Sequence, residues 1–286
     1  MCICPDRFPT EQRSAKLLYV GGYGHSGSTL LEFLLSSSPS VIACGETAGA
    51  VHKLTAARKC SCGMKACDCP VWAPILRQAR EGRQWRHWEV NYDLLSRIGG
   101  HTAIVDSSKT AWRQIAMPFV LRRRLGNGFA LIHIVRDPRA VCWSMMRRSI
   151  RTKSSKNPAL VCASAALGWL IANLACELFR WKFPAGYTRL SYETLASSPE
   201  GVVRSLLARE GLDYDPEFLV SNANRHQMFG NRIRRKGLRL NEVKPDIAWQ
   251  RAMPRKYQAL AWLLSTPLGR RYSYCPETGA SHGLGE

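Results

Sequence analysis

Short apolar runs alternate along the chain with longer stretches in which apolar residues recur at helical spacing. The clearest run is FALIHIV at 129–135, which lies between the turn residues Asn127-Gly128 and Arg136. Runs that are apolar throughout are typical of strands buried on both faces of a parallel sheet. The pattern therefore predicts a three-layer α/β fold with a central parallel sheet of about five strands. Strands are predicted at 17–20, 41–44, 101–105, 129–135 and 187–191, and helices from 28 and at 112–125, 138–149, 159–182, 199–210 and 249–264.

The stretch 160–179 is long and apolar enough to be considered as a membrane span. It contains Asn173 and Glu177, which share a helical face with Arg180, and a carboxylate inside a membrane is costly. We therefore expect a buried helix of a soluble protein and no transmembrane segment. The first 14 residues lack the apolar core of a secretory signal, which predicts a cytoplasmic location.

The same pattern indicates one domain over residues 16–275, between a flexible N-terminus (1–15) and a flexible C-terminus (276–286). Within it, 47–100 has weak periodicity and contains clustered cysteines and tryptophans, so we expect a less regular insertion there.

A glycine-rich loop follows the first predicted strand and leads directly into the first helix. Gly22 and Gly27 have the spacing of the nucleotide-binding pattern G-x-x-x-x-G-K-[ST], and Thr29 is in place. Free N–H groups and the positive end of the helix dipole would attract a phosphate or sulfate there. Ser28 stands where the pattern has lysine, which counts against a nucleoside triphosphate. A tight turn without a ligand is the alternative.

A second anion-binding pattern follows the fourth predicted strand. Arg136 ends that strand, and Ser144 lies two turns into the next helix, so a guanidinium and a hydroxyl could hold a phosphate together. A helix start capped by Asp137 is the alternative. Glu46 and Lys109 also follow strands, and the carboxyl ends of parallel strands meet at one edge of a sheet. The glycine loop, Glu46, Lys109 and Arg136 are therefore expected to lie close together.

The charge balance supports an anionic ligand. The chain has 41 Lys and Arg against 21 Asp and Glu, a formal net charge of +20. Such a field attracts phosphorylated cofactors, acidic glycans or an anionic surface. Dense basic runs interleaved with aromatic residues are lacking, so no specific nucleic-acid partner is expected.

With both motifs in place, the chain resembles the sulfotransferases that use 3′-phosphoadenosine-5′-phosphosulfate (PAPS), over roughly residues 16–275. The tyrosylprotein-type and bacterial enzymes are the most similar. In this resemblance a P-loop-like loop holds the 5′-phosphosulfate, and Arg136, Ser144, Arg148 and Tyr192 match the pattern around the 3′-phosphate. The loop residues that match are Gly24, His25, Ser26, Gly27, Ser28, Thr29 and Leu30.

The resemblance also implies a reaction: PAPS is the donor, PAP is the product, no catalytic metal is needed, and the acceptor is a hydroxyl on a glycan, glycolipid, peptide or small molecule. Glu46, in Cys44-Gly45-Glu46, matches the family's catalytic base. His25 replaces a usual Lys or Arg, and a bound phosphosulfate should favour its charged form. Either His25 or Lys109 would stabilise the leaving group.

A basic segment late in the chain offers two further candidates. Arg235 and Lys236, followed by Gly237, resemble a sequence with which cytosolic sulfotransferases cover the 3′-phosphate. A solvated charge run is the alternative.

Two other functions stay open at this point. A nucleotide-dependent kinase would use Asp106 as its magnesium-binding carboxylate. A non-catalytic protein that binds anions or nucleic acid would need only the positive charge and not Glu46.

The chain has eleven cysteines, which without a secretory signal does not indicate a disulfide framework. Four of them, Cys60, Cys62, Cys67 and Cys69, are spaced C-x-C-x4-C-x-C. Four thiols this close could bind a structural zinc ion, form disulfides or remain free. The stretch also resembles the C-x-C-G and C-P-x-W sequences of bacterial sulfotransferases.

Overall fold

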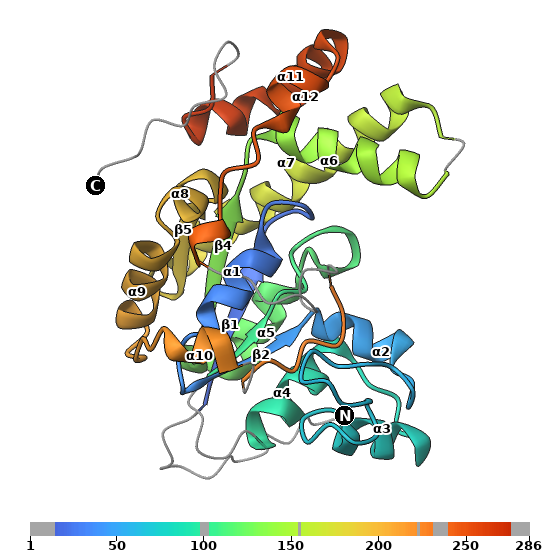
Figure 1. Ribbon diagram of the computed structural model, residues 1–286, viewed down its shortest axis with the longest axis vertical. Coiled ribbons are helices and arrows are strands. Elements are labelled where there is room, and N and C mark those ends of the chain that lie inside the picture. The colour runs from blue at the N-terminus through green and yellow to red at the C-terminus, as the bar shows by residue number, and fades with distance from the viewer. Residues whose placement is uncertain (1–14, 98–102, 154–155, 222–223, 231–239, 276–286) are drawn as a thin grey trace, which may run out of the picture.

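The central feature of the computed structural model is a parallel β-sheet between layers of helices (Figure 1). The structure describes residues 15–97, 103–153, 156–221, 224–230 and 240–275. Within them five strands form one sheet in the order β2-β3-β1-β4-β5, and every pairing is parallel. This confirms the predicted three-layer α/β fold. The strands are β1 (Lys16–Gly21), β2 (Val41–Gly45), β3 (Ala103–Asp106), β4 (Phe129–Val135) and β5 (Tyr187–Ser191).

The strands are apolar throughout because both faces of the sheet are covered. In β1, Leu17 and Tyr19 pack into one apolar cluster, while Leu18 and Val20 pack into the cluster on the other face. All seven residues of β4 are buried. Successive side chains of a strand point to opposite faces, so each strand contributes to both clusters.

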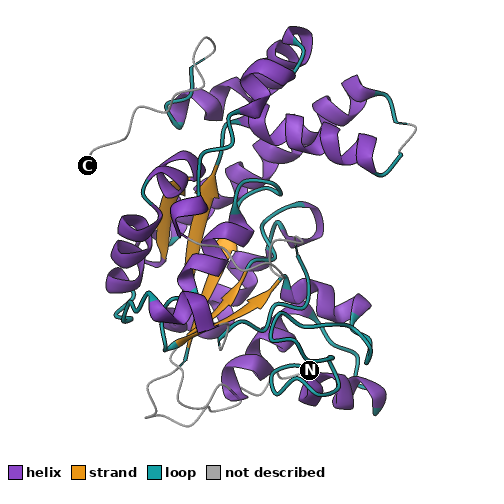
Figure 2. Cartoon of the chain, in the orientation of Figure 1, coloured by secondary structure: helices purple, strands orange, loops and turns teal. Residues whose placement is uncertain are grey.

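Each face of the sheet has its own group of helices, drawn in purple in Figure 2. The face that carries Leu18 and Val20 is covered by α1 (Ser28–Leu35), α8 (Tyr192–Ser197), α9 (Pro199–Arg209) and α10 (Glu217–Ser221). The opposite face is covered by α2 (Ala50–Lys53), α3 (Ala73–Arg80), α4 (His87–Arg97), α5 (Met117–Leu125) and the end of α7 (Pro158–Lys182).

Beyond the sheet, α7 packs with three other helices into a separate apolar cluster (Figure 1). Two of these helices begin at N-terminal side-chain caps. Asp137 accepts a hydrogen bond from Arg139 N and Asn157 one from Ala159 N, each at 2.8 Å, and proline follows each cap. The three partners are α6 (Pro138–Arg151), α11 (Ala248–Ala252) and α12 (Arg255–Arg271).

The prediction of a buried helix at 160–179 is right for only one face of α7. Trp169 and Asn173 are fully buried, and Asn173 contacts His133 Nε2 at 2.7 Å. By length and composition α7 is long enough to cross a bilayer, and 44% of its most apolar window is buried. The other face is apolar but open to solvent. The prediction missed this because the periodicity of a sequence does not reveal whether a second apolar face packs against a neighbour. Its exposed residues are Leu160, Leu167, Ile171, Leu174, Leu178 and Trp181.

Three other predicted elements differ in the structure. The segment 47–100, expected to be less regular, contains α2, α3 and α4. The helix expected at 249–264 is two helices, because Pro254 lacks the N–H that a continuous helix would need. The helix expected at 112–125 is a 3₁₀ turn followed by α5. Single 3₁₀ turns span Thr47–Gly49, Trp112–Gln114, Gly126–Gly128, Pro184–Gly186 and Leu240–Glu242.

Candidate active site

The glycine loop joins β1 to α1 and approaches its neighbours closely at two positions that only glycine can occupy. Gly22 has φ 109°, and a Cβ there would lie 2.4 Å from the carbonyl oxygen of Ile134. Gly27 has φ 97°, and a Cβ there would lie 2.6 Å from the Tyr192 ring. Both backbones occupy the left-handed region that favours glycine. Among the residues that the structure describes, no side chain caps α1, so its N-terminal end is available to an anion.

The other loop residues differ in exposure. Ser26 and Ser28 are buried, whereas Gly24, His25, Thr29 and Leu30 are partly buried. Within the described residues, the buried Ser26 Oγ has no hydrogen-bond partner. An unpartnered buried hydroxyl is costly, so a ligand oxygen at this place would be stabilising.

His25 connects the loop to the second predicted motif. Its Nδ1 lies 2.9 Å from Ser144 Oγ on α6, and its backbone has φ 67°. Burial, followed by the charges of Arg148 and Lys109, lowers the pKa of His25 to about 4. The imidazole is therefore neutral at neutral pH in this structure. A bound phosphosulfate would add negative charge beside it and is still expected to favour the charged form.

Arg136 lies at the centre of a polar cluster at the end of β4. Its guanidinium donates to the backbone oxygens of His25 (3.1 Å) and Asp246 (2.9 Å) and pairs with the Asp246 carboxylate at 3.2 Å. It also lies 4.1 Å from the centre of the Tyr192 ring, whose hydroxyl accepts a hydrogen bond from Asp246 N. Arg136 Nε is buried and, within the described residues, has no hydrogen-bond partner. The structure therefore groups Arg136, His25, Ser144 and Tyr192.

Arg148 is exposed on α6 and contributes to the positive potential at His25. Arg235 and Lys236 lie outside the described residues.

Glu46 and Lys109 form an ion pair at the same edge of the sheet. Glu46 follows β2 and Lys109 follows β3, and these strands are adjacent and parallel, so both residues lie at the same carboxyl end of the sheet. The Glu46 side chain is 33% exposed and that of Lys109 is 15% exposed. The Lys109 carbonyl accepts a hydrogen bond from Tyr19, and the charge of the Lys109 side chain helps to lower the pKa of His25. The pair is therefore solvent-accessible and electrostatically coupled to the loop.

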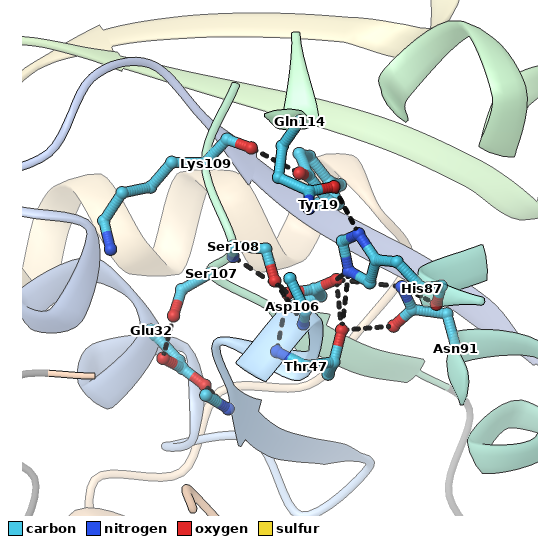
Figure 3. Close-up of polar contacts among 12 residues, drawn as sticks. Tyr19, Glu32, Thr47, His87, Asn91, Asp106, Ser107, Ser108, Lys109 and Gln114 are labelled. Carbon is cyan, nitrogen blue, oxygen red and sulfur yellow. Dashed lines mark hydrogen bonds and ion pairs between the residues drawn. The ribbon is translucent and has the colours of Figure 1, made fainter. Parts of the chain in front are cut away.

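Asp106 organises the backbone beside this pair (Figure 3). Its Oδ2 accepts hydrogen bonds from Thr47 Oγ1 (2.6 Å) and Asn91 Nδ2 (2.9 Å) and lies 2.8 Å from His87 Nε2. Its Oδ1 accepts from the backbone N–H groups of Ser108 (2.8 Å) and Thr47 (3.3 Å). Thr47 is next to Glu46 in the chain and Ser108 is next to Lys109, so this network positions both members of the ion pair.

The network also excludes Asp106 as a ready magnesium ligand. The carboxylate is fully buried, and both of its oxygens are occupied. Burial by itself would raise the pKa of Asp106, but the charge of His87 and the hydrogen bonds of His87, Ser108 and Thr47 outweigh it and lower that pKa. The kinase hypothesis needed Asp106 for a metal ion, and the structure gives this residue a different role. The contributions of His87 and Asn91 were not predicted, although their spacing of four places them on one helical face.

Glu32 of α1 is a second buried carboxyl group that the sequence did not single out. It accepts hydrogen bonds from Gly45 N and from Ser107 Oγ, the latter at 2.6 Å. Burial raises the pKa of Glu32 to about 7 despite these hydrogen bonds. Glu32 therefore connects α1 to the ends of β2 and β3, directly behind Glu46 and Lys109.

The Glu32→Gln substitution is expected to flatten the pH dependence of stability. Because Glu32 binds its proton more tightly in the folded protein, the free energy of unfolding decreases as pH rises from 4.5 to about 7. A pKa rise from 4.5 to about 7 corresponds to a loss of about 3 kcal/mol. Glutamine cannot ionise and should abolish this loss. Urea unfolding at both ends of the range measures it, with exposed Glu81→Gln as control, and an unchanged pH slope in Glu32→Gln would contradict the assignment.

The cysteine cluster differs from its prediction in one member. Cys60, Cys62 and Cys69 lie together, and the fourth neighbour is His226. Cys67 is exposed and is not part of the group. Within the described part of the chain, all nine cysteines are free thiols.

Comparison with known proteins identifies the fold. No protein-family model matches the chain, and no curated protein sequence matches it either. Among solved structures, the sulfotransferase domain from the curacin biosynthetic pathway superposes with a TM-score of 0.58 at 20% identity, covering 89% of this chain and 97% of that domain. The sulfotransferase domain of the Synechococcus PCC 7002 olefin synthase gives 0.57 at 20% identity, covering 91% and 97%.

A mouse enzyme extends this similarity to a nucleotide complex. Mouse sulfotransferase SULT7A1, solved with PAP, superposes with a TM-score of 0.52 at 15% identity, covering 91% of this chain and 86% of that one. At such low identities the similarity establishes the fold, which is that of the sulfotransferases.

Proposed function

We propose that this chain, which has the sulfotransferase fold, transfers a sulfuryl group from PAPS to a hydroxyl group of an acceptor. The observation that carries the proposal is the convergence of three features at one edge of the sheet. These are the glycine loop with the uncapped α1, the Arg136 cluster, and the ion pair of Glu46 and Lys109. A donor anion, its second phosphate and a base for the acceptor would each have a place there.

The donor would be held at both of its ends. The backbone N–H groups at the start of α1 and the buried Ser26 hydroxyl suit the 5′-phosphosulfate. Arg136 and Ser144, with the exposed Arg148 nearby, suit the 3′-phosphate, and the unpartnered Arg136 Nε is a donor available to it. The half-exposed Asp246 carboxylate pairs with Arg136, so a phosphate would compete with it.

The proposed reaction is a displacement at sulfur. Glu46 accepts the proton of the acceptor hydroxyl while that oxygen bonds to sulfur. The bond between sulfur and the bridging oxygen breaks, and PAP leaves with the negative charge on its 5′-phosphate. Lys109 stabilises this charge, since it contacts Glu46 and lies close enough to the loop to lower the pKa of His25. His25 can donate a hydrogen bond to the same oxygens. The step as written uses no metal ion.

Two alternatives have less support from the contacts. A kinase would need a loop lysine, where Ser28 stands, and a free Asp106, whose oxygens are both occupied. A passive anion-binding protein would have no use for a partly exposed carboxylate beside the anion site, because Glu46 weakens the attraction for negative charge.

Donor selectivity tests the proposal without knowledge of the acceptor. Adenosine 3′,5′-bisphosphate should bind more tightly than 5′-AMP by about ten- to a hundredfold, because only the former engages Arg136 and Ser144. The Arg136→Ala substitution should remove most of this difference. Isothermal titration calorimetry measures both nucleotides on both proteins.

The matched control is Arg147→Ala, which removes an exposed arginine from the same helix and should preserve the selectivity. Equal affinity of the unaltered protein for the two nucleotides would refute the proposed donor site.

A further inference from the structure

Three thiols and one imidazole form a compact group that has no part in the proposed reaction. Cys60, Cys62 and Cys69 come from the loop between α2 and α3, and His226 comes from a segment far along the chain. Their sulfur and nitrogen atoms all lie within 4.8 Å of one another. Cys60, Cys69 and His226 are buried, and Cys62 is partly buried. A buried cluster of soft donors is the chemistry of a metal site.

The spacing of the donor atoms is that of ligands around one ion. Sγ of Cys69 lies 3.8 Å from that of Cys60 and 3.9 Å from that of Cys62. Its distance to His226 Nδ1 is 3.3 Å. A tetrahedron with zinc–sulfur bonds of about 2.3 Å and zinc–nitrogen bonds of about 2.0–2.1 Å has edges of about 3.8 Å between sulfurs and about 3.6 Å between sulfur and nitrogen. The sulfurs are thus at the separation of co-ligands, far beyond a disulfide bond.

We infer that Cys60, Cys62, Cys69 and His226 bind a structural zinc ion. Four protein ligands fill a tetrahedral shell and leave no open position for substrate, which is the pattern of structural rather than catalytic zinc sites. Three thiolates and an imidazole also favour zinc over magnesium or calcium, which prefer oxygen ligands. This site does not depend on the proposed sulfuryl transfer.

The surrounding backbone holds the ligands in place through contacts that leave the donor atoms free. Cys60 N donates to Met64 O and Cys69 N to Lys65 O, each at 2.9 Å, which folds the cysteine loop on itself. His226 is fixed on both sides, since its N–H donates to Ala43 O at 2.8 Å and its carbonyl accepts from the Trp72 indole. Such outer contacts orient metal ligands before the ion binds.

A second set of contacts joins the cysteine loop to the strand-like segment that carries His226. Ser61 Oγ donates to Arg225 O at 2.8 Å and accepts from Gln227 N at 2.7 Å, and Ser61 N donates to Gln227 O at 3.1 Å. Ser61 lies between the ligands Cys60 and Cys62 in sequence, and Arg225 and Gln227 flank the ligand His226. Hydrogen bonds therefore hold the two segments side by side at the cluster itself.

The zinc ion would link the segment that carries His226 to the cysteine loop, beside β2 and Glu46. Ala43 of β2 pairs with Arg225 as a parallel bridge, and Phe229 O accepts a hydrogen bond from Glu46 N at 3.3 Å. Arg58 lies over the Phe229 ring at 4.2 Å and donates to Met228 O at 3.2 Å. Metal binding would thus stabilise the fold of residues 225–229 against β2 and the cysteine loop.

Metal analysis of the freshly purified full chain tests the inference, and Cys67 supplies a matched control. The unaltered protein and Cys67→Ser should each contain about one zinc ion per chain, whereas Cys69→Ser and His226→Ala should lose it to a chelator that leaves the unaltered protein loaded. His226→Cys should retain zinc, since it completes a set of four thiolates. Absence of zinc from the unaltered protein would overturn the inference. So would retention of zinc by Cys69→Ser and His226→Ala at the level of the unaltered protein.

Cobalt substitution keeps the test decisive if a ligand variant fails to fold. The unaltered protein loaded with Co²⁺ should show the thiolate charge-transfer absorption and the intense visible bands of a tetrahedral site. His226→Cys should shift these bands, because a sulfur replaces a nitrogen, and Cys67→Ser should leave them unchanged. A six-coordinate cobalt spectrum, or a change of spectrum in Cys67→Ser, would contradict the assigned ligands.

Discussion

The Glu46→Gln substitution is expected to lower kcat by about 10²–10⁴-fold while the affinity for PAP stays nearly unchanged. Glutamine preserves the size of the side chain and can still hydrogen-bond to Lys109, but it cannot accept a proton from the acceptor. A general base acts chiefly in the transition state, so its loss should appear in kcat rather than in donor binding. The measurement is steady-state turnover of PAPS with a hydroxyl acceptor, beside calorimetry with PAP.

The control for this variant is Glu200→Gln, which changes an exposed carboxylate on α9 by the same atoms. It should leave both kcat and PAP affinity unaltered. If Glu46→Gln turns over PAPS at the rate of the unaltered protein, Glu46 is not the base.

The Lys109→Ala substitution is expected to lower kcat by about 10²–10³-fold, because it removes the cation that faces the charge developing on the leaving phosphate. The backbone should tolerate the change, since the Tyr19 hydroxyl bonds to the Lys109 carbonyl and not to its side chain. Lys109→Arg should restore part of the rate by returning a positive charge. Turnover and PAP affinity of both variants, measured in parallel, separate catalysis from binding.

An exposed lysine gives the matching control for Lys109. Lys53→Ala at the end of α2 removes the same charge and should not change kcat. A kcat for Lys109→Ala equal to that of Lys53→Ala would assign the leaving-group charge to His25 or to the loop alone.

Much of the sheet could be predicted because its strands are buried on both faces. The predicted boundaries of β4 and β5 coincide with those observed, since each is an uninterrupted run between turn residues. The same topology explains why Glu46 and Lys109 meet, for parallel neighbours end at one edge. Residues placed by strand order alone were therefore within reach of sequence reasoning.

Features that depend on distant contacts were not predictable in this way. His226 joins Cys69 across 157 residues, and no local pattern connects them, whereas Cys67 was grouped with the other cysteines by spacing alone. Burial, followed by cations on α6 and at the end of β3, lowers the pKa of His25, and both effects arise only in the folded site. The open apolar face of α7 and the occupied oxygens of Asp106 likewise follow from which neighbours pack there.

Thermal unfolding in the presence of nucleotides tests the donor assignment most directly, because it needs neither an acceptor nor a variant. At a concentration about a hundredfold above Kd, a ligand adds about 2.7 kcal/mol to stability, which for a domain of this size corresponds to a rise in Tm of about 5 °C. The proposed donor site predicts such a rise with adenosine 3′,5′-bisphosphate and a much smaller one with an equal concentration of ATP and magnesium. A larger rise with ATP and magnesium, or none with adenosine 3′,5′-bisphosphate, would contradict it.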